Sequence, residues 1–235
     1  MNKILASAMV LVASALADRC AAGILDPEPA YPVSSRYSRF APAPYDWSGL
    51  YVGVNGGASL GQATWTSDPD LASGTAGFSS GVLGGTIGYN AQTIGSFVYG
   101  TDFDFDWRQA KAVVPPASCT PNCELSSAWL ASGRLRFGYA FNYFMPYVTA
   151  GVAMSDFWSS TVGRPFGLRH DLVFGLVGGG GLEAVVSGPL TAKVEYLYIG
   201  YGGTTCDTPC GGGPIRMTPG EHLIRGGLNF RLWSQ

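Results

Sequence analysis

The chain has 235 residues, a formal net charge of −2 and a charged-residue content of 13 %, about half the share in an ordinary soluble protein. The near-neutral balance offers no basic surface for a nucleic acid, and no apolar run beyond the first twenty residues is long enough for a transmembrane helix. With 34 glycines and 13 % aromatic residues, the composition favours many strands joined by tight turns.

The N-terminus resembles an export signal. Lys3 supplies a positive start, residues 4–16 an apolar core, and Ala15-Leu16-Ala17 a small-residue cleavage site. We therefore expect residues 1–17 to be a signal peptide and residues 18–46, which are rich in proline, to be an extended periplasmic linker. Cys20 follows Arg19, which does not suit a lipidation signal, so Cys20 is expected to be a free thiol.

From Trp47 to Gln235 the pattern changes to strands, in which apolar and small or polar residues alternate with period two. Eight segments show this pattern: 50–60, 80–90, 97–107, 129–141, 147–156, 172–186, 190–201 and 222–233. In the third segment Phe103, Phe105 and Trp107 share one face, and the opposite face carries carboxylates. A soluble sandwich or a membrane barrel could present such a strand.

The connections between these strands alternate in length. Residues 61–79, 108–128, 157–171 and 202–221 form long connections, whereas 91–96, 142–146 and 187–189 are short. Long outer loops and short periplasmic turns are typical of a transmembrane barrel, and aromatic residues collect near both ends of the segments as interfacial girdles would. The sequence predicts an all-β fold, an eight-stranded antiparallel up-and-down transmembrane β-barrel spanning residues 47–235.

Five segments carry a resemblance to a known family. They are Asp46–Gly53, Gly81–Asn90, Arg134–Phe141, Val194–Tyr198 and Ile224–Phe230. These segments resemble the small outer-membrane β-barrel (porin-like) family of alphaproteobacteria, related to opacity-type surface proteins. The resemblance implies a location in the outer membrane of a Gram-negative bacterium, with its lipid and the barrel-insertion machinery as partners. It implies fold more than activity and brings no catalytic motif.

Charged residues are expected to fill the lumen. The third segment repeats the D-x-D-x-D opening of a calcium loop, but Trp107 and Val113 replace the required Gly and Glu, so no metal site is expected. A turn near Gly188 would place Glu183 directly opposite Lys193. The predicted lumenal ion-pair network comprises Asp102, Asp104, Asp106, Arg134, Arg136, Glu183, Lys193, Glu195 and Arg225. In an eight-stranded barrel such a network plugs the lumen instead of conducting.

Two further sets of residues have recognisable chemistry. Cys119 and Cys123, and likewise Cys206 and Cys210, flank a proline within a long connection. Local disulfides are expected, although four cysteines allow three connectivities, and no histidine completes a zinc set. His170 and His222 are the only histidines, and neither lies in a Ser-His-acid pattern, so a catalytic role is not expected.

The function predicted from these features is that of a non-enzymatic outer-membrane barrel without a cofactor. It would contribute to envelope structure and expose loops to a host or envelope partner. The alternative is a small-solute porin or a surface receptor for a ligand such as haem, and an embedded hydrolase is a third hypothesis.

Overall fold

The computed structural model describes residues 45–67, 73–93, 96–114, 123–161, 169–206 and 215–233. The predicted signal peptide, most of the predicted linker, Cys20, Cys119 and Cys210 lie outside these residues. The chain divides into two compact units, 1–43 and 44–235, and the second is considered by itself. Among the described residues, none forms a helix long and apolar enough to cross a membrane.

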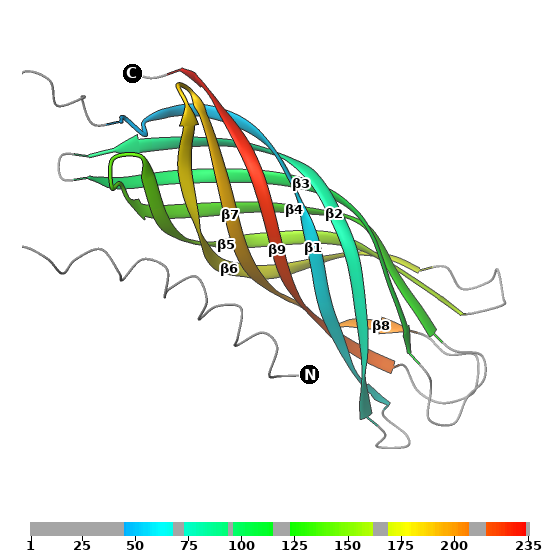
Figure 1. The fold of residues 1–235 in the computed structure, drawn as a ribbon. Coiled ribbons are helices and arrows are strands. Elements are labelled where there is room, and N and C mark those ends of the chain that lie inside the picture. Colours follow the sequence, from blue (N-terminus) through cyan, green and yellow to red (C-terminus); the bar gives the residue numbers. More distant parts are fainter. Residues whose placement is uncertain are drawn as a thin grey trace, which may run out of the picture. The chain divides into compact units, whose positions relative to one another are not determined.

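The second unit is built of antiparallel strands (Figure 1). Their bounds are β1 (Gly49–Ser67), β2 (Ser73–Gln92), β3 (Phe97–Val114), β4 (Cys123–Tyr139), β5 (Phe144–Thr161), β6 (Arg169–Ser187), β7 (Leu190–Tyr201), β8 (Thr204–Cys206) and β9 (Ile215–Trp233). Each strand from β1 to β6 pairs with the next, β7 pairs with β9, and β9 pairs with β1, so eight strands close a barrel. The short β8 pairs only with β9. The predicted eight-stranded antiparallel barrel is confirmed.

The turns at one end of the barrel are tight. Gly188 connects β6 to β7 with φ of 52°, and Asn142 connects β4 to β5 with φ of 58°, a left-handed conformation that glycine and asparagine adopt most readily. Short turns face the periplasm in outer-membrane barrels. We therefore call this end the periplasmic end and the opposite end the outer end.

The half of the barrel next to the periplasmic end carries an apolar outer surface, which we call the membrane zone. It comprises residues 50–60, 83–92, 97–107, 129–139, 144–155, 174–187, 190–200 and 222–233. Large side chains of this zone point outwards, including Leu83 at 67 %, Leu135 at 70 % and Leu176 at 74 % exposure. The stretches have 10 to 14 residues each, enough for a tilted transmembrane strand, which requires about 9–11. Lipid is the solvent that suits such a surface.

The strands continue well beyond this zone, which corrects the predicted boundaries. The first strand was expected to end at Leu60, yet β1 reaches Ser67, and the second was expected to begin at Ser80, yet β2 begins at Ser73. We call the continuation the collar: residues 61–67, 73–82, 108–114, 123–128, 156–161, 169–173 and 215–221. Most of what the sequence suggested to be long loops is therefore β-structure at the outer end.

The collar has the opposite polarity to the membrane zone. Gln62, Thr64 and Thr66 point outwards, while Ala63 is fully buried inside. The large apolar exceptions on the described outer face of the collar are Val113, Trp158 and Leu172. An apolar cluster fills the collar interior and the adjoining lumen, with Phe78, Val82, Ala110, Ala112, Leu125, Leu130, Phe157, Val173, Leu197, Met217 and Leu223 among its members.

A β-bulge in β4 marks the border between the two zones. The register of β4 shifts against β3 between Trp107 and Ala110, and against β5 between Ser126 and Leu130. Asp156 occupies the interruption, because its Oδ1 accepts hydrogen bonds from the backbone amides of Ala128 (3.1 Å) and Trp129 (3.0 Å). A carboxylate thus satisfies backbone donors that the ladder leaves unpaired.

Candidate functional site: the charged lumen

All nine charged residues predicted for the lumen lie on the inner face of the barrel, and none is more than 4 % exposed. The even positions of β3 and β4 and the odd positions of β6, β7 and β9 supply them, as the strand period requires. Their pairing, however, runs across the lumen as well as between neighbouring strands. Closure of the barrel brings β3 and β4 opposite β7 and β9, so the partners of a charge come from both sides.

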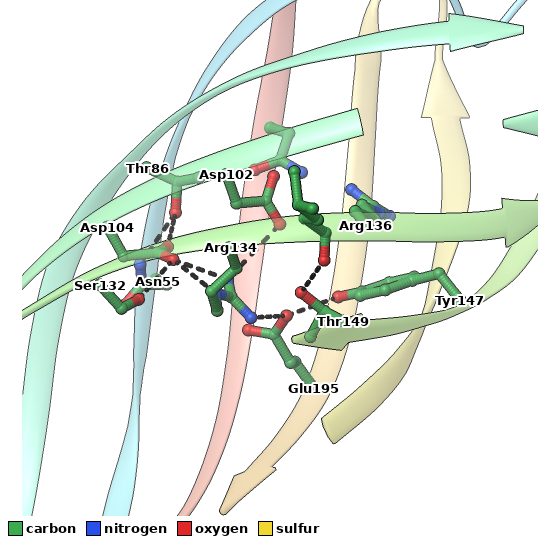
Figure 2. A network of polar contacts seen from close by, with 12 residues as sticks. Asn55, Thr86, Asp102, Asp104, Ser132, Arg134, Arg136, Tyr147, Thr149 and Glu195 are labelled. Carbon is green, nitrogen blue, oxygen red and sulfur yellow. Dashed lines mark hydrogen bonds and ion pairs between the residues drawn. The ribbon is translucent and has the colours of Figure 1, made fainter. Parts of the chain in front are cut away.

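Four of these residues form a closed ring of alternating charge. The Arg134 guanidinium contacts Asp104 Oδ2 at 2.6 Å and Glu195 Oε2 at 2.8 Å. The Arg225 guanidinium contacts Asp104 Oδ1 at 2.9 Å and Glu195 Oε1 at 2.8 Å. Each carboxylate therefore bridges two arginines, and each arginine bridges two carboxylates. Figure 2 shows Arg134 between Asp104 and Glu195. We call these four residues the charge ring.

The remaining two aspartates of β3 extend this ring. Asp106 Oδ2 lies 2.8 Å from Arg225 Nη1, and Asp102 Oδ2 lies 3.4 Å from Arg134 Nη2. Asp104 also accepts a hydrogen bond from Thr86 Oγ1 at 2.6 Å. Planar guanidinium groups suit such bridging, because they offer several donors in a fixed geometry.

A second group of polar contacts lies nearer the periplasmic end. Arg136 pairs with Glu183, which also accepts hydrogen bonds from Thr191 and, at 2.9 Å, from Asn229 Nδ2. The Arg136 guanidinium lies 3.7 Å from the ring centroid of Tyr147. The Tyr147 hydroxyl in turn donates to Glu195 Oε2 at 3.0 Å, which connects this group to the charge ring (Figure 2).

Lys193 lies directly opposite Glu183 in the β6–β7 ladder, as the turn near Gly188 predicts. Glu183 is nevertheless bonded to Arg136, and Lys193 Nζ has no hydrogen-bond partner among the described residues. The side chain lies close to β9, since a Cβ atom at Gly227 would be 3.3 Å from Lys193 Cε. Its charge acts electrostatically on Asp104, Asp106 and Glu195.

A third group, which sequence reasoning missed, lies within the apolar cluster. Arg108 Nη1 contacts Glu221 Oε2 at 2.5 Å, and its Nη2 donates to Ser155 Oγ at 2.8 Å. The Tyr201 hydroxyl donates to Glu221 at 3.0 Å. Arg108 and Glu221 were assigned to long connections, but they keep the strand parity of Asp106 and Arg225. Continuing the alternation past Trp107 would have found Arg108, and extending it backwards from His222 would have found Glu221.

These contacts determine what the lumen can do. Charges with fully buried side chains have lost their hydration, and the opposite charges and neutral hydrogen-bond donors around them compensate for it. Two small cavities are lined by described residues: one of about 20 Å³ at the periplasmic end and one of about 10 Å³ in the collar. Side chains therefore occupy most of the space that eight strands enclose.

The two histidines lie on the outer face, away from these groups. His222 Nδ1 is 2.7 Å from the Tyr196 hydroxyl, and the His170 ring lies 4.4 Å from that of Trp158. The described residues contain no group of three or more His, Cys, Asp or Glu that could hold a metal ion. Cys123 begins β4 and Cys206 ends β8, and the predicted disulfides remain predictions.

Comparison with known proteins agrees with this architecture. The family model of the outer membrane protein beta-barrel domain matches residues 38–214. A 25 kDa outer-membrane immunogenic protein of Brucella melitensis is 30 % identical over 190 residues, which are 80 % of either chain. A 22 kDa outer membrane protein of Rhizobium leguminosarum is 32 % identical over 66 % of this chain and 64 % of its own.

Among solved structures, the outer membrane protein OprG of Pseudomonas aeruginosa matches with a TM-score of 0.52 and 14 % identity, over 78 % of this chain and 97 % of its own. This likeness concerns the fold alone. The match to the family model covers most of the chain, and the relatives are outer-membrane proteins of alphaproteobacteria, as the resemblance implied. The chain belongs to the outer membrane protein β-barrel family and is an outer-membrane protein.

Proposed function

We propose that this protein is a closed, non-enzymatic outer-membrane barrel that contributes to envelope structure and presents its outer loops to partners. The observation that carries the proposal is the charge ring, in which Arg134, Arg225, Asp104 and Glu195 connect opposite walls of the lumen. An ion that passed through would have to separate fully buried pairs, which is costly in a low-dielectric interior. The apolar cluster adds a second barrier, because it offers ions no hydration.

The collar supports a role in presenting loops. It carries β-structure beyond the membrane zone, so the connections at its outer end start away from the lipid surface. The Brucella relatives are described as immunogenic, which is in keeping with accessible outer loops in this chain also. A scaffold that is rigid inside and variable at its loops is a common arrangement for recognition.

The absence of an enzymatic role is supported by the position of the candidate groups. A general base must lie within hydrogen-bond reach of a nucleophile or water that it activates. His170 and His222 contact aromatic residues on the outer face. Two of the buried serines, Ser127 and Ser155, accept hydrogen bonds from Arg108. Neither set resembles a nucleophile oriented by a base.

Planar-bilayer recording tests the proposal. The refolded protein, inserted into a bilayer and checked for heat-modifiable gel migration, should give no stable unitary current steps. A general porin inserted into the same bilayer is the positive control. Reproducible unitary steps would instead support the small-solute porin. Titration with haemin tests the alternative of a haem receptor, which predicts a saturable shift of the haem absorption band.

A further inference from the structure

The residues just before β1 cross the periplasmic end of the barrel without joining its ladder. The Trp47 amide donates to Gln92 Oε1 at 2.8 Å, and the Trp47 indole Nε1 donates to the backbone oxygen of Asn142 at 3.1 Å. The Gln92 amide donates to Ser48 Oγ at 3.0 Å, and the Tyr45 amide donates to Asn142 Oδ1 at 3.1 Å. We call residues 45–48 the strap. The strap contacts Gln92 at the C-terminal end of β2 and Asn142 in the turn between β4 and β5.

Side-chain packing reinforces these hydrogen bonds. Trp47 is only 3 % exposed although it lies outside any strand, and it packs in a cluster with Val98, Ala140 and Met145. On the other side, the Arg231 guanidinium donates to the backbone oxygen of Asp46 and lies 4.6 Å from the Tyr45 ring centroid. The strap is therefore anchored to β9 as well, and a buried indole stabilises it by the hydrophobic effect.

Directly beneath the strap lies the cavity of about 20 Å³. Tyr45 and Trp47 line it on the periplasmic side, and Asn90, Glu183 and Asn229 line it on the lumen side. The side-chain oxygens of Asn90 and Asn229 are buried without a hydrogen-bond partner. A cavity of this size with several polar groups is sufficient for one water molecule.

We propose that the strap is a releasable seal of the periplasmic mouth, and that one water molecule binds Asn90 and Asn229 beneath it. The seal is separate from the charge ring, which closes the lumen deeper in the membrane zone. It rests on individual side chains outside the β-ladder, so it can open without unpairing any barrel strand.

Thiol accessibility tests the seal directly. In a background with all five cysteines changed to serine, Asn90→Cys places one thiol in the cavity. The full-length mature protein is reconstituted in lipid nanodiscs, and the rate of modification by a small charged methanethiosulfonate is measured. Trp47→Ala should accelerate modification by about tenfold or more. Opening of the strap in the parent protein exposes the buried indole to water, and this cost is absent in the variant.

Two further variants keep the test decisive. Asn142→Gly tolerates the left-handed φ of 58° but loses the bond to the Tyr45 amide, and it should give a smaller acceleration. Trp158→Ala, at the outer end of β5, is the matched control and should leave the rate unchanged. Heat-modifiable migration checks that each variant is folded. Equal rates in the parent, Trp47→Ala and Asn142→Gly proteins would overturn the proposal.

Discussion

The membrane zone and the collar are parts of the same strands with opposite polarity. In the membrane zone of β3, Asp102, Asp104 and Asp106 face the lumen while Phe103 and Phe105 face outwards. In the collar of the same strand the buried residues beyond Arg108 are Ala110 and Ala112. The parity of the alternation does not change along β3. What changes, close to Arg108, is the kind of residue on each face: inward residues change from charged to apolar, and outward residues become more polar.

This exchange shows that the surroundings, and not the strand itself, decide which residues face outwards. Lipid surrounds the membrane zone, so the apolar residues face out and the polar ones satisfy each other in the lumen. The polar outer face of the collar suits water, where the ordinary rule of an apolar interior applies. Charge pairs dominate the interior of the first region, whereas the interior of the second is an apolar cluster around one buried pair, Arg108–Glu221. The two regions are therefore expected to respond differently to substitution.

The largest effect is expected in the charge ring. Asp104→Asn preserves the shape of the side chain but leaves Arg134 and Arg225 without one of their shared carboxylates. Breaking a buried charge network from one side typically costs about 3–5 kcal/mol in the free energy of unfolding. Urea unfolding in lipid vesicles, followed by the heat-modifiable gel shift, measures it. Thr64→Ala on the collar surface is the control, and an equal loss of stability there would contradict a special role of the ring.

A matched pair of arginine substitutions probes the outer face. Leu135 is 70 % exposed in the membrane zone, and Thr64 is exposed in the collar. Leu135→Arg should lower the free energy of unfolding by about 2–4 kcal/mol, because it places a charge in lipid. Thr64→Arg, in water, should change it by less than about 0.5 kcal/mol. Similar costs at the two positions would show that both lie in the same solvent.

The smallest effect is expected from removing methyl groups. Val173 is buried in the collar cluster, whereas Val152 is 58 % exposed on the outer face. Val173→Ala should cost about 1–2 kcal/mol, since buried apolar groups are lost without replacement. Val152→Ala should cost less than about 0.5 kcal/mol, because lipid fills the space. The same unfolding measurement separates them, and the reverse order would contradict an apolar collar interior.

Much of the fold could be predicted from the sequence, because the membrane zone has a strong local signal. Large outward residues such as Phe103 and Leu135 alternate with polar ones, and this alternation located the eight strands. The collar lacks that contrast. Its outer face carries residues such as Thr75 and Ser79, and its inner face carries small ones such as Ala76, so the segment resembles a polar loop. A strand was recognisable from the sequence only where its two faces differed strongly in the size and polarity of their side chains.

The sequence predicted which charged residues line the lumen, but it did not predict which of them pair with one another. Parity alone places Asp104, Arg134 and Glu195 in the lumen, but it does not say which charges meet across it. The Arg225–Asp104 contact joins residues on β9 and β3, two strands that do not pair with each other in the barrel. Such pairs depend on the stagger with which the barrel closes, and no local pattern encodes that stagger.

An accessibility scan along β1 tests the exchange of polarity most directly. Single spin labels at the even positions from Val52 to Thr66 would be compared for collisions with oxygen, which concentrates in lipid, and with a water-soluble nickel complex. The labels up to Leu60 should favour oxygen, and those from Gln62 onwards should favour nickel. Preference for oxygen continuing to Thr66 would contradict the account, because the collar would then lie within the membrane.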